Sequence, residues 1–377
     1  MTSKPHPMNP ATPHRIDVHH HFFPPGYVSA LHRLGIVKTG GVPLPHWSAD
    51  QTLALMDRQG IATSILSISA PGAYFGDVGL AQELARQCNE FSADLIKAYP
   101  GRFGAFAVLP LPDVGAALAE LTHALDNLHL DGVVLMTNVE GRYLGEPVFD
   151  PILAELNRRR VPTFVHPTST EDGAAGHSGS SSRVPYPFDS ILLKFRKTAV
   201  VDLPVSMVDW PFDTTKAVAH LLVGGALKRF PHIPFILSHA GGAVPYLAWR
   251  LALFQERLDP QLSDIAIHGR EMLTHKFSRG PLEESARGLD LLRRLYFDTA
   301  FSATPYVFGS LFALVDTSHI LFGTDLGVAA EFVAAQTVRG IAEEPGISQD
   351  GRLAIERDSA LSLFPRLRGV PVSPAGL

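Results

Sequence analysis

The sequence predicts a (β/α)8 barrel, the TIM-barrel class of α/β fold, for its 377 residues. Eight short apolar runs, rich in β-branched or aromatic residues and bounded by glycine, proline or aspartate, are typical of buried strands. Amphipathic segments of helical period separate most of them. Strands that alternate with helices form a parallel sheet covered by helices, and eight such units can close into a barrel. The expected strands span residues 15–22, 62–69, 103–110, 131–137, 161–167, 233–240, 294–300 and 319–325.

The expected outer helices lie between these strands, at residues 48–60, 80–100, 113–130 and 149–160. Two further stretches are additional to the strands and helices of a minimal barrel. The Gly/Ser-rich residues 171–184 follow the fifth strand and are expected to be either disordered or a mobile lid. Residues 185–232 are expected to form a largely helical insertion between strands 5 and 6.

The domain organisation is expected to be simple. A single barrel domain covers residues 15–365, between a flexible N-terminal tail at 1–14 and a C-terminal tail at 366–377. No composition shift or linker divides the chain further.

Composition excludes several classes of protein. The net charge of −5 and the absence of a Lys/Arg run argue against a nucleic-acid partner. No apolar run reaches about 18 residues, so we expect no membrane span, and residues 1–14 lack the apolar region of a signal peptide. Cys88 is the only cysteine, which fits a reducing compartment. We therefore expect a cytoplasmic protein.

Three consecutive histidines, His19, His20 and His21, lie in the first expected strand. Strand side chains alternate between two faces, so Asp17, His19 and His21 share one face. Two imidazoles one residue apart on the same side suit a single metal ion. His20 is expected to point outward, toward the helices. A solvated tract, or core histidines bonded to backbone, would explain the run without a metal.

Other ionisable residues stand where later strands end: His166 in FVHP, His239 in LSHAGG and Asp325 in FGTD. Burying such a group at the end of an apolar strand is costly unless it is paired or ligated. Barrel strands bring their carboxyl ends to one face, where active sites lie. The sequence therefore predicts a metal site at this face.

The motifs IDVHHHFFPP, FVHP, FPHIPFILSHAGG and LFGTD resemble those of the amidohydrolase superfamily, as does WPFDTTKAVAHLLVGGALKRFP before His239. The resemblance covers about residues 15–365. It is strongest to the decarboxylase branch, which includes aminocarboxymuconate semialdehyde decarboxylase and the decarboxylases of salicylate-type acids.

The resemblance implies metal ligands at His19, His21, His166 and Asp325, and a catalytic histidine at His239. Some relatives have glutamate at the position of His19. The metal therefore stays open between zinc, which a histidine-rich site favours, and manganese. Two-metal amidohydrolases carry a lysine on the fourth strand, and residues 131–137 contain none. We expect one divalent ion per chain, and the resemblance also implies a homodimer.

Such a site suits non-oxidative decarboxylation of a small aromatic acid. A carboxylate and an ortho phenol can bind one cation together, and Asp325 is the candidate general acid–base that protonates the ring carbon. Residues 44–50 contain no arginine, which favours a monocarboxylate. The leading expectation is 6-methylsalicylate, converted to 3-methylphenol and CO2. The expected substrate-binding residues are Phe23, Trp47, Trp210, Phe212 and Arg183, with Phe301 among the other aromatic residues near strand ends.

Three alternatives stay open. The first is decarboxylation of aminocarboxymuconate semialdehyde, in which His239 takes a proton from water. The second is metal-dependent hydrolysis of a lactone or cyclic amide on the same barrel. The third is not an enzyme but a barrel that keeps the metal for structure or for regulation of a partner. A structural zinc site is closed by four ligands without a spare acid or base, which argues against the third.

Overall fold

The computed structural model describes residues 14–168, 183–185, 200–255 and 281–368. Eight parallel strands form one sheet in the order β1-β4-β5-β6-β9-β12-β13-β14. Each predicted run overlaps one of them, so the predicted barrel is confirmed. The strands are β1 (Arg15–His21), β4 (Ile61–Ser67), β5 (Phe103–Val108), β6 (Gly132–Met136), β9 (Thr163–His166), β12 (Phe235–Leu237), β13 (Tyr296–Asp298) and β14 (Ile320–Leu321).

Hydrogen bonds between the two ends of the sheet close the barrel. The Val18 N–H donates to the Phe322 carbonyl at 2.9 Å, and the His21 N–H donates to the Leu326 carbonyl at 2.7 Å. The first strand is thereby joined to the segment that follows the last one. This closure brings the HHH run beside the FGTD motif, although 300 residues of sequence separate them.

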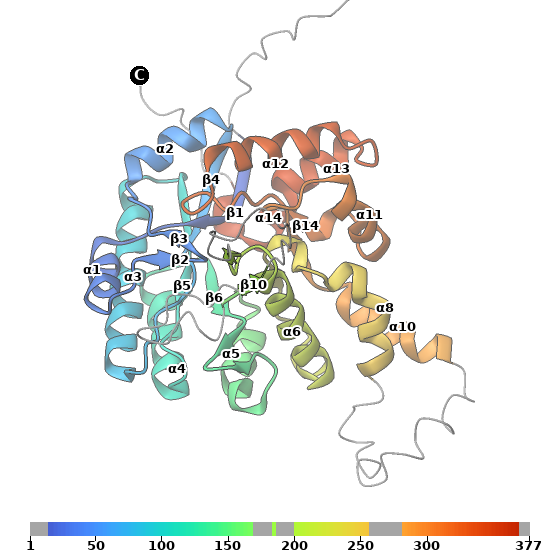
Figure 1. Cartoon of the computed structure of the whole chain (residues 1–377), viewed down its shortest axis with the longest axis horizontal. Helices are drawn as coiled ribbons and strands as arrows, with labels where there is room; N and C mark the ends of the chain where they lie inside the picture. The colour runs from blue at the N-terminus through green and yellow to red at the C-terminus, as the bar shows by residue number, and fades with distance from the viewer. Residues whose placement is uncertain (1–13, 169–182, 186–199, 256–280, 369–377) are drawn as a thin grey trace, which may run out of the picture.

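Helices surround the strands (Figure 1). Several begin at side-chain caps that the sequence supplies, such as Ser48, Asp77 and Asp113, whose oxygens accept backbone N–H groups of the first turn. The α8 and α10 helices pack together and extend outward from the barrel (Figure 1). The helices are α1 (Pro25–Arg33), α2 (Ala49–Arg58), α3 (Val78–Ala98), α4 (Val114–Thr122), α5 (Asp150–Arg159), α6 (Asp209–Val223), α7 (Ala226–Arg229), α8 (Val244–Gln255), α10 (Pro281–Leu292), α11 (Pro305–Leu314), α12 (Glu331–Glu343), α13 (Gln349–Leu353) and α14 (Ser359–Leu363).

Short irregular helices complete the described chain. Two π-helices continue α4 and α13, at His123–Asn127 and Ala354–Asp358. Single 3-10 turns lie at Pro147–Phe149, His239–Gly241, Thr317–His319 and Pro365–Leu367. Small antiparallel pairs decorate the loops: β2 (Lys38–Thr39) with β3 (Val42–Pro43), β7 (Asn138–Val139) with β8 (Arg142–Tyr143), and β10 (Arg183–Pro185) with β11 (Val200–Asp202).

The expected insertion between strands 5 and 6 is only partly helical in the described residues. The α6 and α7 helices occupy its second half, and α6 fills the barrel position between β9 and β12. The first half contributes the β10–β11 pair, which the sequence pattern did not reveal. The expected disordered or lid segment at 171–184 lies almost wholly outside the described residues. At the C-terminal end, Arg366 pairs with Asp131 at 2.7 Å, so the packed chain extends slightly past residue 365.

A column of aromatic rings leads to the first of the strand histidines. The Phe164 ring stacks on Phe106, with centroids 5.2 Å apart, and Phe106 contacts Phe364 at 5.8 Å. The His19 ring contacts the other end of this column, 5.0 Å from Phe164. Aromatic packing therefore forms a rigid apolar floor under the histidines.

Candidate metal centre

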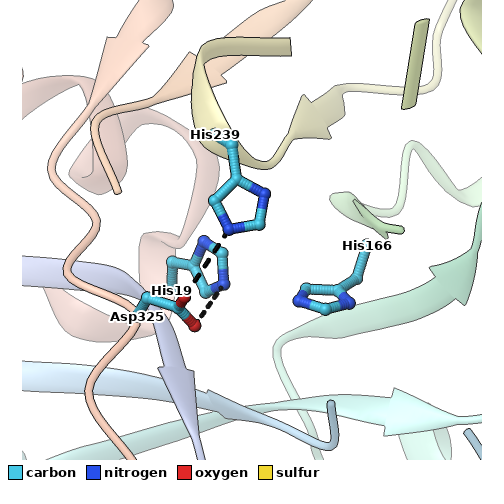
Figure 2. Close-up of side chains that lie close together, drawn as sticks. All are labelled: His19, His166, His239 and Asp325. Atoms are coloured by element: carbon cyan, nitrogen blue, oxygen red, sulfur yellow. Dashed lines mark ion pairs between the residues drawn. The ribbon is translucent and has the colours of Figure 1, made fainter. Parts of the chain in front are cut away.

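Four side chains at the carboxyl face of the barrel could hold one ion. His19, His166, His239 and Asp325 each offer a ligand atom, and these atoms lie within 4.8 Å of one another. Figure 2 shows the three imidazoles and the carboxylate converging from separate strand ends. Asp325 lies 3.2 Å from His19 Nε2 and 3.6 Å from His239 Nε2.

His21 lies at the edge of this group. Its Nε2 is 3.1 Å from His19 Nε2 and 3.0 Å from Asp325 Oδ1. The structure thus brings together all five residues that the sequence singled out. The group of four differs from the expected ligand set, however, because it contains His239 in place of His21.

Asp298, the last residue of β13, supports the centre from outside. One carboxylate oxygen is 2.6 Å from His19 Nδ1, and the other accepts the His239 backbone N–H at 2.8 Å. A carboxylate on Nδ1 leaves Nε2 of the same ring free to face a metal. Sequence reasoning assigned no role to Asp298, although RLYFDTA carries this acidic residue near its end, much as FGTD carries Asp325.

The electrostatics of the centre favour a cation. Burial opposes charge on His19, but Asp298 and Asp325 outweigh it and raise the pKa of His19 to about 10. Burial would raise the pKa of Asp325, yet the surrounding histidines hold it well below its usual range. Burial and the neighbouring imidazoles lower the pKa of His166 well below its usual value. Two buried carboxylates and a neutral His166 therefore surround a place where positive charge is stabilised.

A buried nitrogen of His166 lacks a protein partner, which fits metal ligation. His166 Nε2 has none, while its Nδ1 is 2.8 Å from the Pro167 carbonyl. His239 Nδ1 also has none, but it is Nε2 of this ring that faces Asp325. Leaving such buried atoms unpaired costs about 1–3 kcal/mol each. Imidazole and carboxylate donors suit zinc and also manganese, so the residues present fit one divalent ion.

Backbone strain places two of these side chains. His239 and Asp325 adopt left-handed conformations, with φ of 54° and 61°, which non-glycine residues rarely take. The Asp325 N–H donates to the His19 carbonyl at 2.8 Å and helps to hold this conformation. Glycines that follow both residues allow other backbone segments to approach closely. A Cβ on Gly242 would collide with the Pro211 carbonyl, and one on Gly327 with the His21 carbonyl.

His20 stays outside the metal-binding group, as predicted. It is fully buried, and its Nδ1 lies 3.2 Å from Asp17. Alternation had placed Asp17 with His19 and His21, but the register of β1 shifts between Asp17 and His20. The Asp17 carboxylate contacts His20 and accepts the Thr324 hydroxyl at 2.6 Å. Asp17 therefore secures the closure of the barrel.

The expected substrate-binding residues occupy different places. Trp210 is buried, and its ring centroid lies 5.5 Å from that of His166. Phe23 is buried in the hydrophobic core. Trp47 packs against Phe22 and Phe91, and Phe212 is 49% exposed. The Arg183 side chain lies outside what the structure describes, although its backbone belongs to β10.

Phe301 is a second aromatic residue beside the centre. Its ring centroid lies 6.3 Å from that of His239, and it is 57% exposed. Its backbone is left-handed, with φ of 54°. Trp210 and Phe301 therefore contact the centre through different histidines.

A cavity of ≈ 570 Å³ adjoins the centre at the same end of the barrel. Residues at the ends of β4, β5, β6 and β9 line it, including Ile68, Leu109, Met136 and Thr168. The histidines are not among its lining residues. Met136 pairs with His166 in the sheet, so the cavity begins beside the strand end that carries this histidine.

A further buried carboxylate lies next to His166. Asp213 on α6 accepts hydrogen bonds from the Thr137 hydroxyl, from the Tyr143 hydroxyl at 2.5 Å and from the Asn138 amide at 3.2 Å. The Thr137 N–H in turn donates to the His166 carbonyl at 2.9 Å. Sequence reasoning quoted WPFDTT without giving its aspartate a role, because the partners lie about 70 residues earlier in the chain.

Comparison with known proteins identifies the family. The Amidohydrolase family model matches residues 16–366. The chain belongs to the amidohydrolase family. The predicted family and its barrel fold are therefore confirmed. Among the described residues, none of the helices combines the length and the apolar character needed to cross a membrane.

Three similar proteins illustrate the relationship. A 6-methylsalicylic acid decarboxylase of Aspergillus aculeatus is 34% identical over 370 residues, which cover 95% of this chain and 99% of the relative. A crystal structure of an amidohydrolase II superposes with a TM-score of 0.75 at 26% identity, covering 93% of this chain and 99% of that one. A dihydroxybenzoic acid decarboxylase of Polaromonas, with bound manganese and 2-nitroresorcinol, has a TM-score of 0.67 at 22% identity, covering 94% and 98%.

Proposed function

We propose that this protein is a metal-dependent, non-oxidative decarboxylase of a salicylate-type acid, with 6-methylsalicylate as the leading substrate and 3-methylphenol and CO2 as products. The observation that carries this proposal is the similarity to a 6-methylsalicylic acid decarboxylase along nearly the whole chain. The five converging side chains supply the site that such a reaction needs. The cavity lining contains no lysine, arginine or histidine, which supports a monocarboxylate over a dicarboxylic semialdehyde.

His19, His21, His166 and Asp325 would hold one divalent ion, zinc or manganese. His21 is fully buried, whereas the His239 side chain keeps 10% of its surface exposed. This difference supports ligation by His21 and leaves His239 for the substrate side. When bound, the ion would withdraw charge from the carboxylate and the adjacent phenol oxygen of the substrate.

The protein residues would handle the proton and exclude water. Asp325 would pass a proton from His239 to the ring carbon that bears the carboxylate, and a C–H bond forms there. The C–C bond to the carboxylate then breaks, its electron pair restores the aromatic ring, and CO2 leaves. His239, 3.6 Å from Asp325, would hold and resupply that proton. Trp210 and Phe301 would flank the ring of the substrate.

In the test, one sample of the protein is loaded with zinc and another with manganese. Each is incubated with 6-methylsalicylate, and 3-methylphenol is then measured by chromatography. Metal-dependent release of 3-methylphenol and CO2 is the expected result. Product that contains added water without loss of CO2 would instead indicate a lactone or cyclic-amide hydrolase. Turnover of aminocarboxymuconate semialdehyde in preference to 6-methylsalicylate would instead indicate a decarboxylase of that semialdehyde.

Two further expectations complete the proposal, one from the family resemblance and one from composition. We propose a homodimer, which light scattering after size-exclusion chromatography would check. We also propose a cytoplasmic location, which cell fractionation would check.

A further inference from the structure

The cavity beside the metal centre is larger than the reaction of a methyl-substituted ring requires. Its ≈ 570 Å³ falls within the range of about 300–1,000 Å³ that holds drug-sized ligands. A methyl group is comparable in size to a water molecule, which occupies only about 30 Å³ of liquid volume.

The walls of the cavity begin directly beyond the centre. Met136 pairs with His166 across β6 and β9, and Ser67 pairs with His21 across β4 and β1. Met136 itself, and Ile68 directly after Ser67, line the cavity. A ring held at the centre therefore has this space beside it.

The lining is apolar and carries no cation. Aliphatic side chains from the strand ends form most of it, and Tyr74, Phe75, Asn138 and Thr168 add aromatic or neutral polar groups. Glu140, whose side chain is exposed, is the only acidic residue of the lining. An anionic substituent would therefore lose its hydration without gaining a cationic partner, and it would face a like charge.

Glu140 stands at the turn between β7 and β8. Its backbone is left-handed, with φ of 52°. Burial raises the pKa of the Tyr74 hydroxyl, and the nearby Glu140 carboxylate from the other loop raises it further. The two loops therefore meet beside the cavity.

We infer that this cavity receives an apolar substituent of the aromatic substrate, so that the enzyme accepts neutral alkyl groups longer than methyl and rejects anionic ones, with Glu140 as a specificity-determining residue. The inference rests on the proposed function, since it assumes that the ring of the substrate lies at the metal centre.

The first experiment measures binding and turnover separately. Calorimetry on the metal-loaded full chain gives the affinity of 3-alkylphenols from methyl to pentyl, and kinetics give kcat/KM for the matching 6-alkylsalicylates. We expect phenol affinity to rise about fourfold per methylene over the first additions, which corresponds to ~0.8 kcal/mol per buried CH2. Affinity that is flat or falls from methyl to propyl would overturn the inference. Phenols that bind more tightly with length, without turnover of any salicylate, would contradict the proposed function alone.

Cavity-filling variants locate the alkyl group. Ala73→Phe, and Val139→Phe as a second variant in case the first fails to fold, should weaken pentylphenol binding at least tenfold and change methylphenol binding less than threefold. Ala54→Phe on the exposed face of α2 is the control and should change neither. Equal losses for both phenols in folded variants would contradict the assignment.

A charge variant tests the rejection of anions. Glu140→Gln should raise kcat/KM for 3-hydroxyphthalate relative to 6-methylsalicylate at least fivefold. Glu90→Gln removes a carboxylate from the exposed surface of α3 and should leave this ratio unchanged. If Glu140→Gln left the ratio of the two kcat/KM values unchanged, Glu140 would not be a specificity-determining residue.

Discussion

His239 is the residue that can separate turnover from metal binding. It approaches Asp325 at 3.6 Å and keeps part of its side chain exposed. We expect His239→Ala to lower kcat by about 10²–10⁴-fold, the usual contribution of a general acid–base group, while the bound metal stays near one ion per chain. Elemental analysis and product chromatography on the same preparation would measure both.

The matched control for this variant is His232→Ala, which removes an exposed histidine on the loop before β12. Both activity and metal content should stay at the level of the unmodified protein. Loss of metal in His239→Ala would instead make this histidine a ligand, as the group of four side chains allows.

A variant of Asp298 tests the contacts that support the metal centre. Its carboxylate binds His19 Nδ1 and the His239 N–H, and it is fully buried. We expect Asp298→Asn to weaken metal affinity about 10–100-fold, the usual effect of losing such a partner. Competition with a chromophoric chelator measures this affinity.

Asp290→Asn on α10, where the carboxylate is 69% exposed, is the control for Asp298→Asn. An unchanged chelator competition curve for Asp298→Asn would show that His19 keeps its orientation without this carboxylate.

Between elements, Asp213 joins α6 to the β7–β8 hairpin and to the strand end beside His166. Three side-chain donors surround its carboxylate, so its removal leaves buried polar groups unpaired. We expect Asp213→Ala to lower the free energy of unfolding by about 1–3 kcal/mol. Thermal or urea unfolding would measure the loss.

Asp209→Ala provides the comparison on the same helix, because Asp209 is exposed in the first turn of α6. It should cost less than about 1 kcal/mol. Equal losses of stability in the two variants would contradict a stabilising role for the hydrogen bonds of Asp213.

At the scale of the whole barrel, Glu356 ties the two ends of the chain together. Its carboxylate lies 2.7 Å from His14 Nε2 and accepts from Arg15 at 2.9 Å, and it is 2% exposed. Burial would raise the pKa of Glu356, but the hydrogen bond with His14 and the charge and hydrogen bond of Arg15 lower it below its usual value of 4.5. A carboxyl whose pKa is lower in the folded state adds stability above its unfolded pKa, and this stability is lost as pH falls through the folded value.

Glu356→Gln should therefore lower the free energy of unfolding by about 1–3 kcal/mol at pH 7. The difference from the unmodified protein should shrink as pH falls below about 4.5. Urea unfolding at a series of pH values from 7 to 3 would follow it. A difference that stays constant down to pH 3 would contradict an ion-pair origin.

The sequence by itself determined the eight strands, the single barrel and the residues that meet at its carboxyl face. These features follow from local rules: apolar runs of strand length, amphipathic segments between them, and ionisable residues at the strand ends. His166, His239 and Asp325 were recognisable because each stands at or near the end of such a run, and His19 and His21 because they lie one residue apart in the first run.

Only the tertiary structure decided how these residues are held. It revealed Asp298 as the shared partner of His19 and His239, the left-handed backbone at Asp325, and the contact of Trp210 with the centre. It also supplied the cavity, which four strand ends and their loops build together. The physical reason is that these features depend on contacts between segments far apart in the chain, and sequence periodicity specifies which face a side chain takes but not which distant group it meets.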